Sequence, residues 1–435
     1  MGFGRDAGWM LLSQVSILLL GLVQSVVLAR YLHPQGRGEY AILLWIPQLL
    51  VILLPLGIQW STLYYLREGG YPRGKVLQTA ATIAFILGGA GLVLALGIGF
   101  SLADSFLTGF SAGALVAAAA LVPVRVVDGF TRGALRGLKE IFAISVLNTV
   151  RPVLTLVGVG VIIVIADGGV TGLVIVVLMA EAAIVMAAFS RVFRGTPFRP
   201  RLEVAVAGPL LHYGIRVYLY SVLLFLNYRL DMGLIRYYLD YEEVGYYATA
   251  VVLAELIWNL PNSLSFVLFP YITGATEEQK RILTLKVCRI STALVGSACI
   301  AVAAGAYPAI YVMYGAEFIP AVWPLLALLP GIFMMSVQQV LGVDLSARNM
   351  PGKVTIAALV GLVVNVGLNV LLIPRWGTVG AAVASSVSYG CVAGIVAYYY
   401  SVASQVPISE AIIPRLGELK ESFRYVRTKL AAVIR

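Results

Sequence analysis

The stretch 29–41, ARYLHPQGRGEYA, separates two long apolar runs and is matched later in the chain by 235–248, IRYYLDYEEVGYYA. Both stretches place Arg-Tyr at the end of one run, then a short polar turn, and then Gly-x-Tyr-Ala at the start of the next run. A second pair of similar stretches, GVTG at 169–172 and GTVG at 377–380, lies 208 residues apart, close to the offset of 206 to 207 residues in the first pair. Two matches at nearly one offset predict an internal repeat with two halves of similar topology.

The composition indicates a membrane protein. The 435 residues are 60% hydrophobic and 12% charged, with a mean hydropathy of +0.92. Soluble domains carry about 25% charged residues, so a soluble enzyme, a disordered chain and a disulfide scaffold are excluded. One helix that crosses a hydrocarbon core of about 30 Å needs roughly 20 apolar residues. Apolar runs of this length predict twelve transmembrane helices, at 8–30, 40–66, 76–102, 112–131, 141–166, 171–191, 208–235, 243–271, 286–308, 316–343, 354–373 and 379–401.

Basic residues predict the orientation of these helices, because Lys and Arg collect in cytoplasmic loops. If the N-terminus is cytoplasmic, 22 of the 31 basic residues fall on the inner side and 4 fall outside, namely Arg30, Arg37, Arg236 and Arg375. We therefore expect a multi-pass protein of the cell (cytoplasmic or inner) membrane with both termini in the cytoplasm. The formal net charge of +10 then reflects a basic face against anionic lipid headgroups, and no nucleic acid is an expected partner.

The predicted fold is all-α, with two parallel six-helix lobes. The N-terminal lobe spans 1–190, a basic cytoplasmic linker spans 191–207, and the C-terminal lobe spans 208–403. In the tail, 404–435, apolar residues recur at helical spacing opposite charged ones, which predicts an amphipathic helix on the inner membrane surface. Two lobes related by an axis along the membrane normal suit alternating access to a site near the midplane.

The repeat stretches also carry a family resemblance. Three parts of the chain resemble the polysaccharide-transporter (O-antigen flippase-like) branch of the multidrug/oligosaccharidyl-lipid/polysaccharide exporter superfamily. They are the stretch 29–41, the pattern NYRLD at 227–231 with VGYY at 244–247, and the Ile-Pro and spaced Gly and Ala residues of 373–384. The resemblance covers roughly residues 8–401. It implies a central cavity between the two lobes, and a flippase that moves a polyprenyl-diphosphate-linked oligosaccharide from the inner to the outer leaflet, for cell-surface polysaccharide or glycoprotein biosynthesis. The implied partners are this lipid-linked oligosaccharide, membrane lipids and enzymes of polysaccharide assembly, with the chain working as a monomer.

Arginines inside the predicted spans are the candidate contacts for an anionic cargo, because charged groups within a membrane are costly and mark functional sites. A guanidinium group binds phosphate oxygens bidentately and keeps its proton. The candidate diphosphate contacts are therefore Arg151 and Arg216, with Arg125 as a third. The structural alternative is that each arginine pairs with a carboxylate and holds helices together. For Arg125, Asp128, Arg132 and Arg136, whose spacings are 3, 4 and 4, a salt-bridge ladder is the favoured interpretation.

Other polar residues in the spans predict contacts with sugars and with a coupling ion. Asn148, Tyr220, Asn227 and Asn259 are candidates to face the cavity and pair with sugar hydroxyls. Glu255, Asp231 and Glu181 are candidates to couple transport to H⁺ or Na⁺, because the pKa of a buried carboxylate can be raised towards neutrality. No catalytic residue, cofactor or metal site is predicted.

Two other functions stay open. A drug/cation antiporter of the same superfamily shares the predicted architecture, but several buried arginines favour an anionic cargo. A membrane glycosyltransferase or polymerase would act on the same lipid-linked sugars. It is disfavoured because the chain has 2 histidines, short loops and neither a GxxxxGK nor an HExxH motif. We therefore expect a transporter and not an enzyme.

Overall fold

The computed structural model describes residues 2–166, 168–195 and 197–413, and the regular structure of these residues is helical. The helices are α1 (Gly2–Leu53), α2 (Ile58–Glu68), α3 (Arg73–Ser101), α4 (Ala112–Gly137), α5 (Ile141–Val161), α6 (Gly169–Val192), α7 (Val204–Tyr238), α8 (Tyr241–Ile272), α9 (Glu277–Tyr314), α10 (Val322–Ala347), α11 (Pro351–Ser404) and α12 (Ile408–Ile412). A π-helical turn, Ile162–Ala166, follows α5, and a 3-10 turn, Ala316–Ala321, precedes α10. The predicted all-α class is confirmed.

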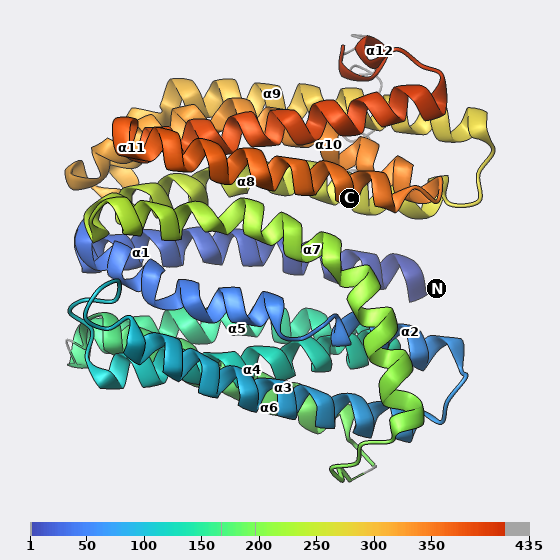
Figure 1. Cartoon of the computed structure of the whole chain (residues 1–435), viewed down its shortest axis with the longest axis horizontal. Coiled ribbons are helices and arrows are strands. Elements are labelled where there is room, and N and C mark those ends of the chain that lie inside the picture. The colour runs from blue at the N-terminus through green and yellow to red at the C-terminus, as the bar shows by residue number, and fades with distance from the viewer. Residues whose placement is uncertain (1, 167, 196, 414–435) are drawn as a thin grey trace, which may run out of the picture. The chain divides into compact units, whose positions relative to one another are not determined.

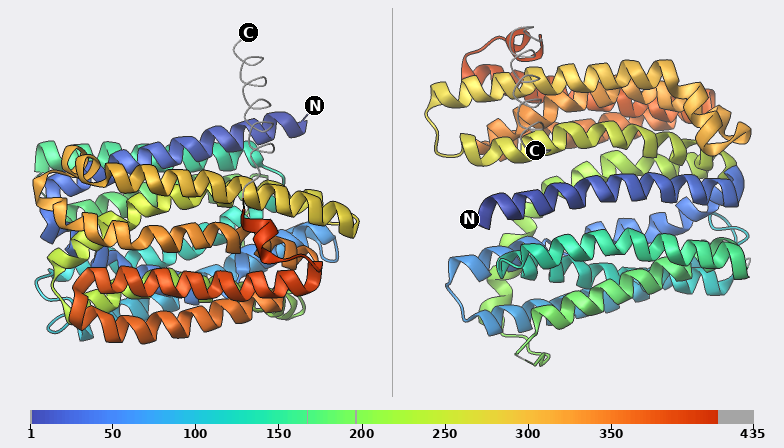
Figure 2. Two further views of the ribbon diagram at one scale, coloured as in Figure 1. Left: turned by 90° about the horizontal axis from the view of Figure 1, so that it is seen from above. Right: turned by 180° about the vertical axis from the view of Figure 1, so that it is seen from behind.

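Ten helical segments among the described residues are long and apolar enough to cross a membrane, which supports a multi-pass membrane protein. The prediction of twelve separate spans differs from the structure at α1 and α11, which contain 52 and 54 residues. At 1.5 Å per residue, each is more than twice as long as one crossing requires. Each passes through a residue with non-helical backbone, His33 (φ 58°) in α1 and Gly377 (φ 58°) in α11, and there the chain doubles back (Figures 1 and 2). Both reversals lie inside the repeat stretches, between spans that the sequence predicts to be separate helices (8–30 and 40–66, 354–373 and 379–401).

The chain forms two compact units, Met1–Ala248 and Thr249–Arg435, which we call unit 1 and unit 2. In unit 1, α4 packs against α2, α3 and α6, while α1 packs against α4, α5 and α7. In unit 2, α10 contacts both α9 and α11, and α12 packs on α9. The boundary between the two units, after Ala248, lies within α8. The predicted lobes themselves remain a prediction.

Helix α7 belongs to unit 1 because it packs along the segment that follows the α1 reversal. Gly214 lies so close to this segment that a Cβ atom on it would be 2.3 Å from the carbonyl oxygen of Leu56. Further along α7, the indole nitrogen of Trp45 donates to the carbonyl oxygen of Arg229 at 2.6 Å. A Cβ on Gly233 would be 2.2 Å from the Trp45 ring. These contacts tolerate no side chain at the two glycines, so the close approach of α7 depends on them.

The two repeat stretches contact each other directly in unit 1. A Cβ on Gly38 would lie 1.6 Å from the carbonyl oxygen of Tyr241, and a Cβ on Gly245 would lie 2.0 Å from the carbonyl oxygen of Pro34. Gly245 follows Gly38 by 207 residues, and Tyr241 follows Pro34 by the same number. The contact is therefore reciprocal, as expected for repeats that meet across a local two-fold axis.

The predicted amphipathic tail helix falls mostly outside the described residues, which end at residue 413. Within the described part of the tail, α12 is a short helix at Ile408–Ile412, and its Ala411 is fully buried.

Candidate functional site

A charged cluster joins α4, α5 and α6 in unit 1. Asp128 on α4 is only 2% exposed and contacts two guanidinium groups. Arg132, four residues later on α4, lies 2.5 Å from Oδ2 of Asp128, and Arg151 on α5 lies 2.7 Å from Oδ1. A spacing of four residues places two side chains on one helix face. The Asp128–Arg132 contact is therefore local, whereas the Asp128–Arg151 contact depends on the packing of α5 against α4.

The second part of the cluster is a forked ion pair between α4 and α6. Arg125 donates from Nε to Oε2 of Glu181 at 2.9 Å and from Nη2 to Oε1 at 2.9 Å. Glu181 is 8% exposed. Two parallel charge-assisted hydrogen bonds are among the stronger polar contacts in proteins, so this pair holds α4 and α6 in a defined register. We refer to Arg125, Asp128, Arg132, Arg151 and Glu181 as the arginine cluster.

The arginine cluster carries an excess of positive charge, because three guanidinium groups face two carboxylates. Its arginines also remain partly accessible: the side chains of Arg125, Arg151 and Arg132 are 18%, 22% and 40% exposed. A guanidinium group has five N–H donors, of which an ion pair uses two or fewer at each contact here. The cluster therefore combines a rigid arrangement with free donors and one uncompensated charge, which suits an anion better than a cation.

The predicted ladder along α4 is mostly replaced by contacts between helices. Within the described residues, Asp128–Arg132 is the one ion pair between neighbouring turns of α4, because Arg125 forms its ion pair with Glu181 on α6. Arg136 lies with its guanidinium carbon 6.0 Å from the ring centroid of Trp60. Arg136 also accepts at its carbonyl oxygen a hydrogen bond of 3.3 Å from Arg67.

The three arginines predicted to bind a diphosphate fall in two places. Arg125 and Arg151 belong to the arginine cluster, where each pairs with a carboxylate. Arg216 is exposed on α7, and no hydrogen bond or ion pair among the described residues joins it to the cluster. Arg125 and Arg151 therefore each pair with a carboxylate and link two helices, as the structural interpretation predicted. The cluster also has the excess positive charge that suits an anion.

The residues predicted to face sugars have different environments. Asn148 is half-buried on α5, three residues before Arg151 and so on the same helix face. On α7, Tyr220 is half-buried and Asn227 is 1% exposed. In unit 2, the amide of Asn259 donates to the carbonyl oxygen of Glu255 at 2.7 Å, a bond within α8.

The three predicted coupling carboxylates are likewise not grouped. Glu181 is bound by Arg125. Asp231 on α7 is 1% exposed and accepts hydrogen bonds from the Tyr247 hydroxyl and from the backbone N–H of Met232, the latter at 2.8 Å. Glu255 is half-buried on α8 in unit 2. Among the described residues, no group of three or more His, Cys, Asp and Glu side chains is arranged to hold a metal ion.

Sequence reasoning missed the partner of Asp231. Tyr247 is part of the repeat stretch 235–248, whose Gly-x-Tyr-Ala pattern marked it as a structural element. Its hydroxyl reaches back 16 residues to Asp231 and closes the turn between α7 and α8. The repeat pattern was the available signal, but a contact between two helices cannot be located from a repeat alone.

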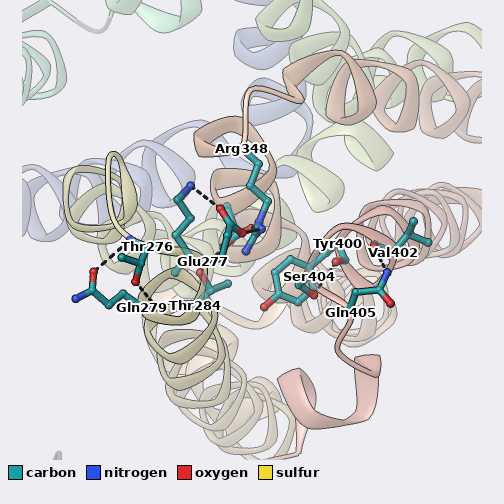
Figure 3. A network of polar contacts seen from close by, with 11 residues as sticks. Thr276, Glu277, Gln279, Thr284, Arg348, Tyr400, Val402, Ser404 and Gln405 are labelled. Carbon is teal, nitrogen blue, oxygen red and sulfur yellow. Dashed lines mark hydrogen bonds and ion pairs between the residues drawn. The ribbon is translucent and has the colours of Figure 1, made fainter.

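Sequence reasoning also missed a polar network in unit 2, where the start of α9 meets the end of α10 (Figure 3). Asp344 is fully buried and accepts hydrogen bonds from Arg348 and, at 2.6 Å, from the hydroxyl of Thr284. Arg348 also pairs with Glu277, which Lys280 contacts at 3.0 Å. Burial acts to lower the pKa of Arg348, but its hydrogen bond to Asp344 and the charges of Asp344 and Glu277 raise that pKa overall. Arg348 is therefore held in its charged form.

Comparisons with known proteins identify the family. The model of a family described as polysaccharide biosynthesis protein matches residues 27–323, more than half of the chain. The chain belongs to this family. The resemblance inferred from the repeat stretches is confirmed by this match. Over 180 residues, or 40% of its length, this family member is 28% identical to the probable low-salt glycan biosynthesis flippase Agl15 of Haloferax volcanii. That match spans 37% of the length of the relative.

Solved structures show the fold of this family member. It is similar to the lipid II flippase MurJ in an inward closed conformation, with a TM-score of 0.79, 15% identity, and coverage of 92% of this chain and 88% of that one. It is also similar to an inward-facing multidrug resistance MATE family transporter of the MOP superfamily, with a TM-score of 0.73, 13% identity, and coverage of 89% and 94%. A MOP superfamily transporter from Pyrococcus furiosus has a TM-score of 0.60 at 14% identity, with coverage of 92% and 95%.

Proposed function

We propose that this protein moves a polyprenyl-diphosphate-linked oligosaccharide from the inner to the outer leaflet of the cytoplasmic membrane by alternating access. Membership of the polysaccharide biosynthesis protein family and the similarity to a probable glycan biosynthesis flippase support a lipid-linked glycan as cargo. The fold shared with MurJ and MATE transporters supports transport over glycosyl transfer. We also propose that the chain crosses the membrane twelve times. In this arrangement α1 and α11 each cross twice, and both termini lie in the cytoplasm.

The observation that carries the proposal is the charge of the arginine cluster. A diphosphate needs a partner with fixed positive charge and N–H donors on its way through a hydrocarbon core of about 30 Å. Three arginines against two carboxylates, at partial exposure, provide both. A cationic drug would be repelled by the same excess charge, so the drug/cation antiporter is the weaker candidate.

The proposal assigns roles to the predicted site residues. Arg151, Arg125 and Arg216 bind the diphosphate. Asn148, Tyr220, Asn227 and Asn259 pair with sugar hydroxyls through their amides and hydroxyl. Glu255, with Asp231 and Glu181 as the other candidates, binds the coupling H⁺ or Na⁺. None of these roles requires a cofactor.

The sharpest test of the cargo uses Arg151→Ala, because Asp128 keeps Arg132 as a partner when Arg151 is removed. The variant is reconstituted in liposomes with a fluorescent polyprenyl-diphosphate disaccharide, and a cationic dye is assayed in parallel. We expect translocation of the glycolipid to fall at least about tenfold, since a charge-assisted contact contributes about 1.5–3 kcal/mol.

Arg281→Ala is the matched control, because Arg281 is exposed and pairs with Glu278 on the surface at 3.0 Å. It removes the same charge from the protein and should leave the rate unchanged. Full activity of Arg151→Ala and Arg216→Ala would remove the diphosphate assignment. Transport of the dye without transport of the glycolipid would favour the antiporter.

A further inference from the structure

A cavity of about 390 Å³ lies at one end of unit 1, apart from the arginine cluster. It opens where α3 begins at Arg73 and where α4 and α6 end, at Gly137 and Val192. Three arginines line it, Arg73, Arg191 and Arg194, together with Glu140 and the apolar side chains of Leu77 and Phe193. The loops at this end hold basic residues that the positive-inside pattern places on the cytoplasmic side.

The charge of this cavity is unbalanced. Arg191 pairs with Glu140 at 2.9 Å, so the negative charge of Glu140 in the lining is neutralised by Arg191. Arg73 and Arg194 are exposed at the cavity, and no ion pair among the described residues engages either of them. The lining therefore has two positive charges in excess. Two forked guanidinium groups around a volume of this size match the oxygens of a phosphate group.

The apolar wall of the cavity continues along the outside of α3 and α6. The ring centroid of Phe193 lies 4.7 Å from that of Phe189, which is 5.7 Å from the ring centroid of Phe85 on α3. The ring of Phe198 packs against all three and belongs to the same apolar surface. Phe85 is 47% exposed, so this row of rings reaches the surface of unit 1 within an apolar span. Phe85 follows Arg73 by twelve residues, or about 18 Å along the helix. A ligand with a phosphate group and a long apolar chain fits both features, whereas a soluble phosphate uses only the first.

We propose that this cavity binds the headgroup of an anionic membrane phospholipid, with Arg73 and Arg194 on the phosphate and an acyl chain along Phe193, Phe189 and Phe85. The lipid is a resident ligand of unit 1 and is distinct from the cargo. Basic pockets at the cytoplasmic ends of transmembrane helices are suited to anionic headgroups, because that leaflet is rich in them.

Native mass spectrometry of the purified full-length protein tests this proposal, with dioleoyl phosphatidylglycerol and dioleoyl phosphatidylcholine as probes. We expect phosphatidylglycerol to bind at least about tenfold more tightly than phosphatidylcholine. The double variant Arg73→Ala/Arg194→Ala should abolish that preference, and Arg73→Lys/Arg194→Lys should retain much of it, because it keeps the charge. Arg199→Ala is the matched control, since Arg199 is exposed in the same connecting segment but does not line the cavity.

Each outcome bears on the proposal. Equal binding of the two lipids, or an unchanged preference in the double alanine variant, would overturn it. Full displacement of phosphatidylglycerol by millimolar inorganic phosphate would also overturn it, because the acyl chain would then contribute nothing. Thermal unfolding of the double alanine variant separates lost binding from lost folding, and we expect an unchanged midpoint because both arginines are exposed.

Discussion

Gly38 lies against the carbonyl group of Tyr241, with no room for a side chain between them. A Cβ on Gly38 would be 1.6 Å from that oxygen. The equivalent glycine of the second repeat, Gly245, makes the same contact with Pro34. The glycine in each Gly-x-Tyr-Ala stretch therefore has a physical reason, because the backbone of the other repeat packs directly against its Cα.

Gly38→Ala should destabilise the protein, because a methyl group at this position overlaps a backbone atom that cannot rotate away. We expect a loss of about 1–3 kcal/mol or more, the range for overpacked positions, seen as a lower midpoint of thermal unfolding in detergent. Gly21→Ala on the same helix is the control, since nothing lies within 4 Å of a Cβ there. Equal midpoints for both variants would show that the repeat contact does not exist.

The pair between Arg125 and Glu181 allows structural and functional roles to be separated. Arg125→Ala leaves Glu181 buried without its forked partner, which costs about 3–5 kcal/mol. The double variant Arg125→Ala/Glu181→Ala removes both charges and should recover most of that stability. If Arg125 or Glu181 has a direct role in transport, the double variant folds but does not translocate the glycolipid. Recovery of both stability and transport would leave Arg125 with a structural role alone.

Glu255 is expected to couple transport to an ion gradient. In Glu255→Gln the amide cannot bind a proton or Na⁺ as the carboxylate does, so the rate in liposomes should no longer respond to an imposed pH or Na⁺ gradient. Glu278→Gln, an exposed carboxylate in unit 2, is the control. If the rate of Glu255→Gln still depends on the gradient, Glu255 is not the coupling group. Asp231→Asn and then a Glu181 variant would be tested in the same way.

Asp344 should be important for the stability of unit 2. Its replacement by alanine leaves Arg348 and Thr284 without their buried acceptor. We expect a loss of about 3–5 kcal/mol, because one partner of a buried ion pair is removed. Glu278→Ala breaks an exposed pair with Arg281 and should cost less than about 1 kcal/mol. Chemical unfolding followed by tryptophan fluorescence compares the two, and similar losses would argue against a special role for Asp344.

Some properties of this protein follow from the sequence alone. Apolar runs and few charges predict membrane helices, because a bilayer leaves a backbone no other way to satisfy its hydrogen bonds over such lengths. The repeat stretches predict the family, and the Asp128–Arg132 pair follows from a spacing of four residues on one helix. These signals are local or periodic, so they need no knowledge of which helices are neighbours.

The remaining properties were decided by tertiary structure. Three contacts join residues that are far apart in the sequence. Arg125 pairs with Glu181, 56 residues away, and Arg151 pairs with Asp128, 23 residues away. Asp344 accepts a hydrogen bond from Thr284, 60 residues away. A helix places side chains around its full circumference, and spacing alone does not say which face meets which helix. The packing of α4 against α5 and α6 therefore decided which arginines are paired and left one positive charge uncompensated. The sequence predicted which charges lie within the membrane, and the packing of the helices determined which of them neutralise each other.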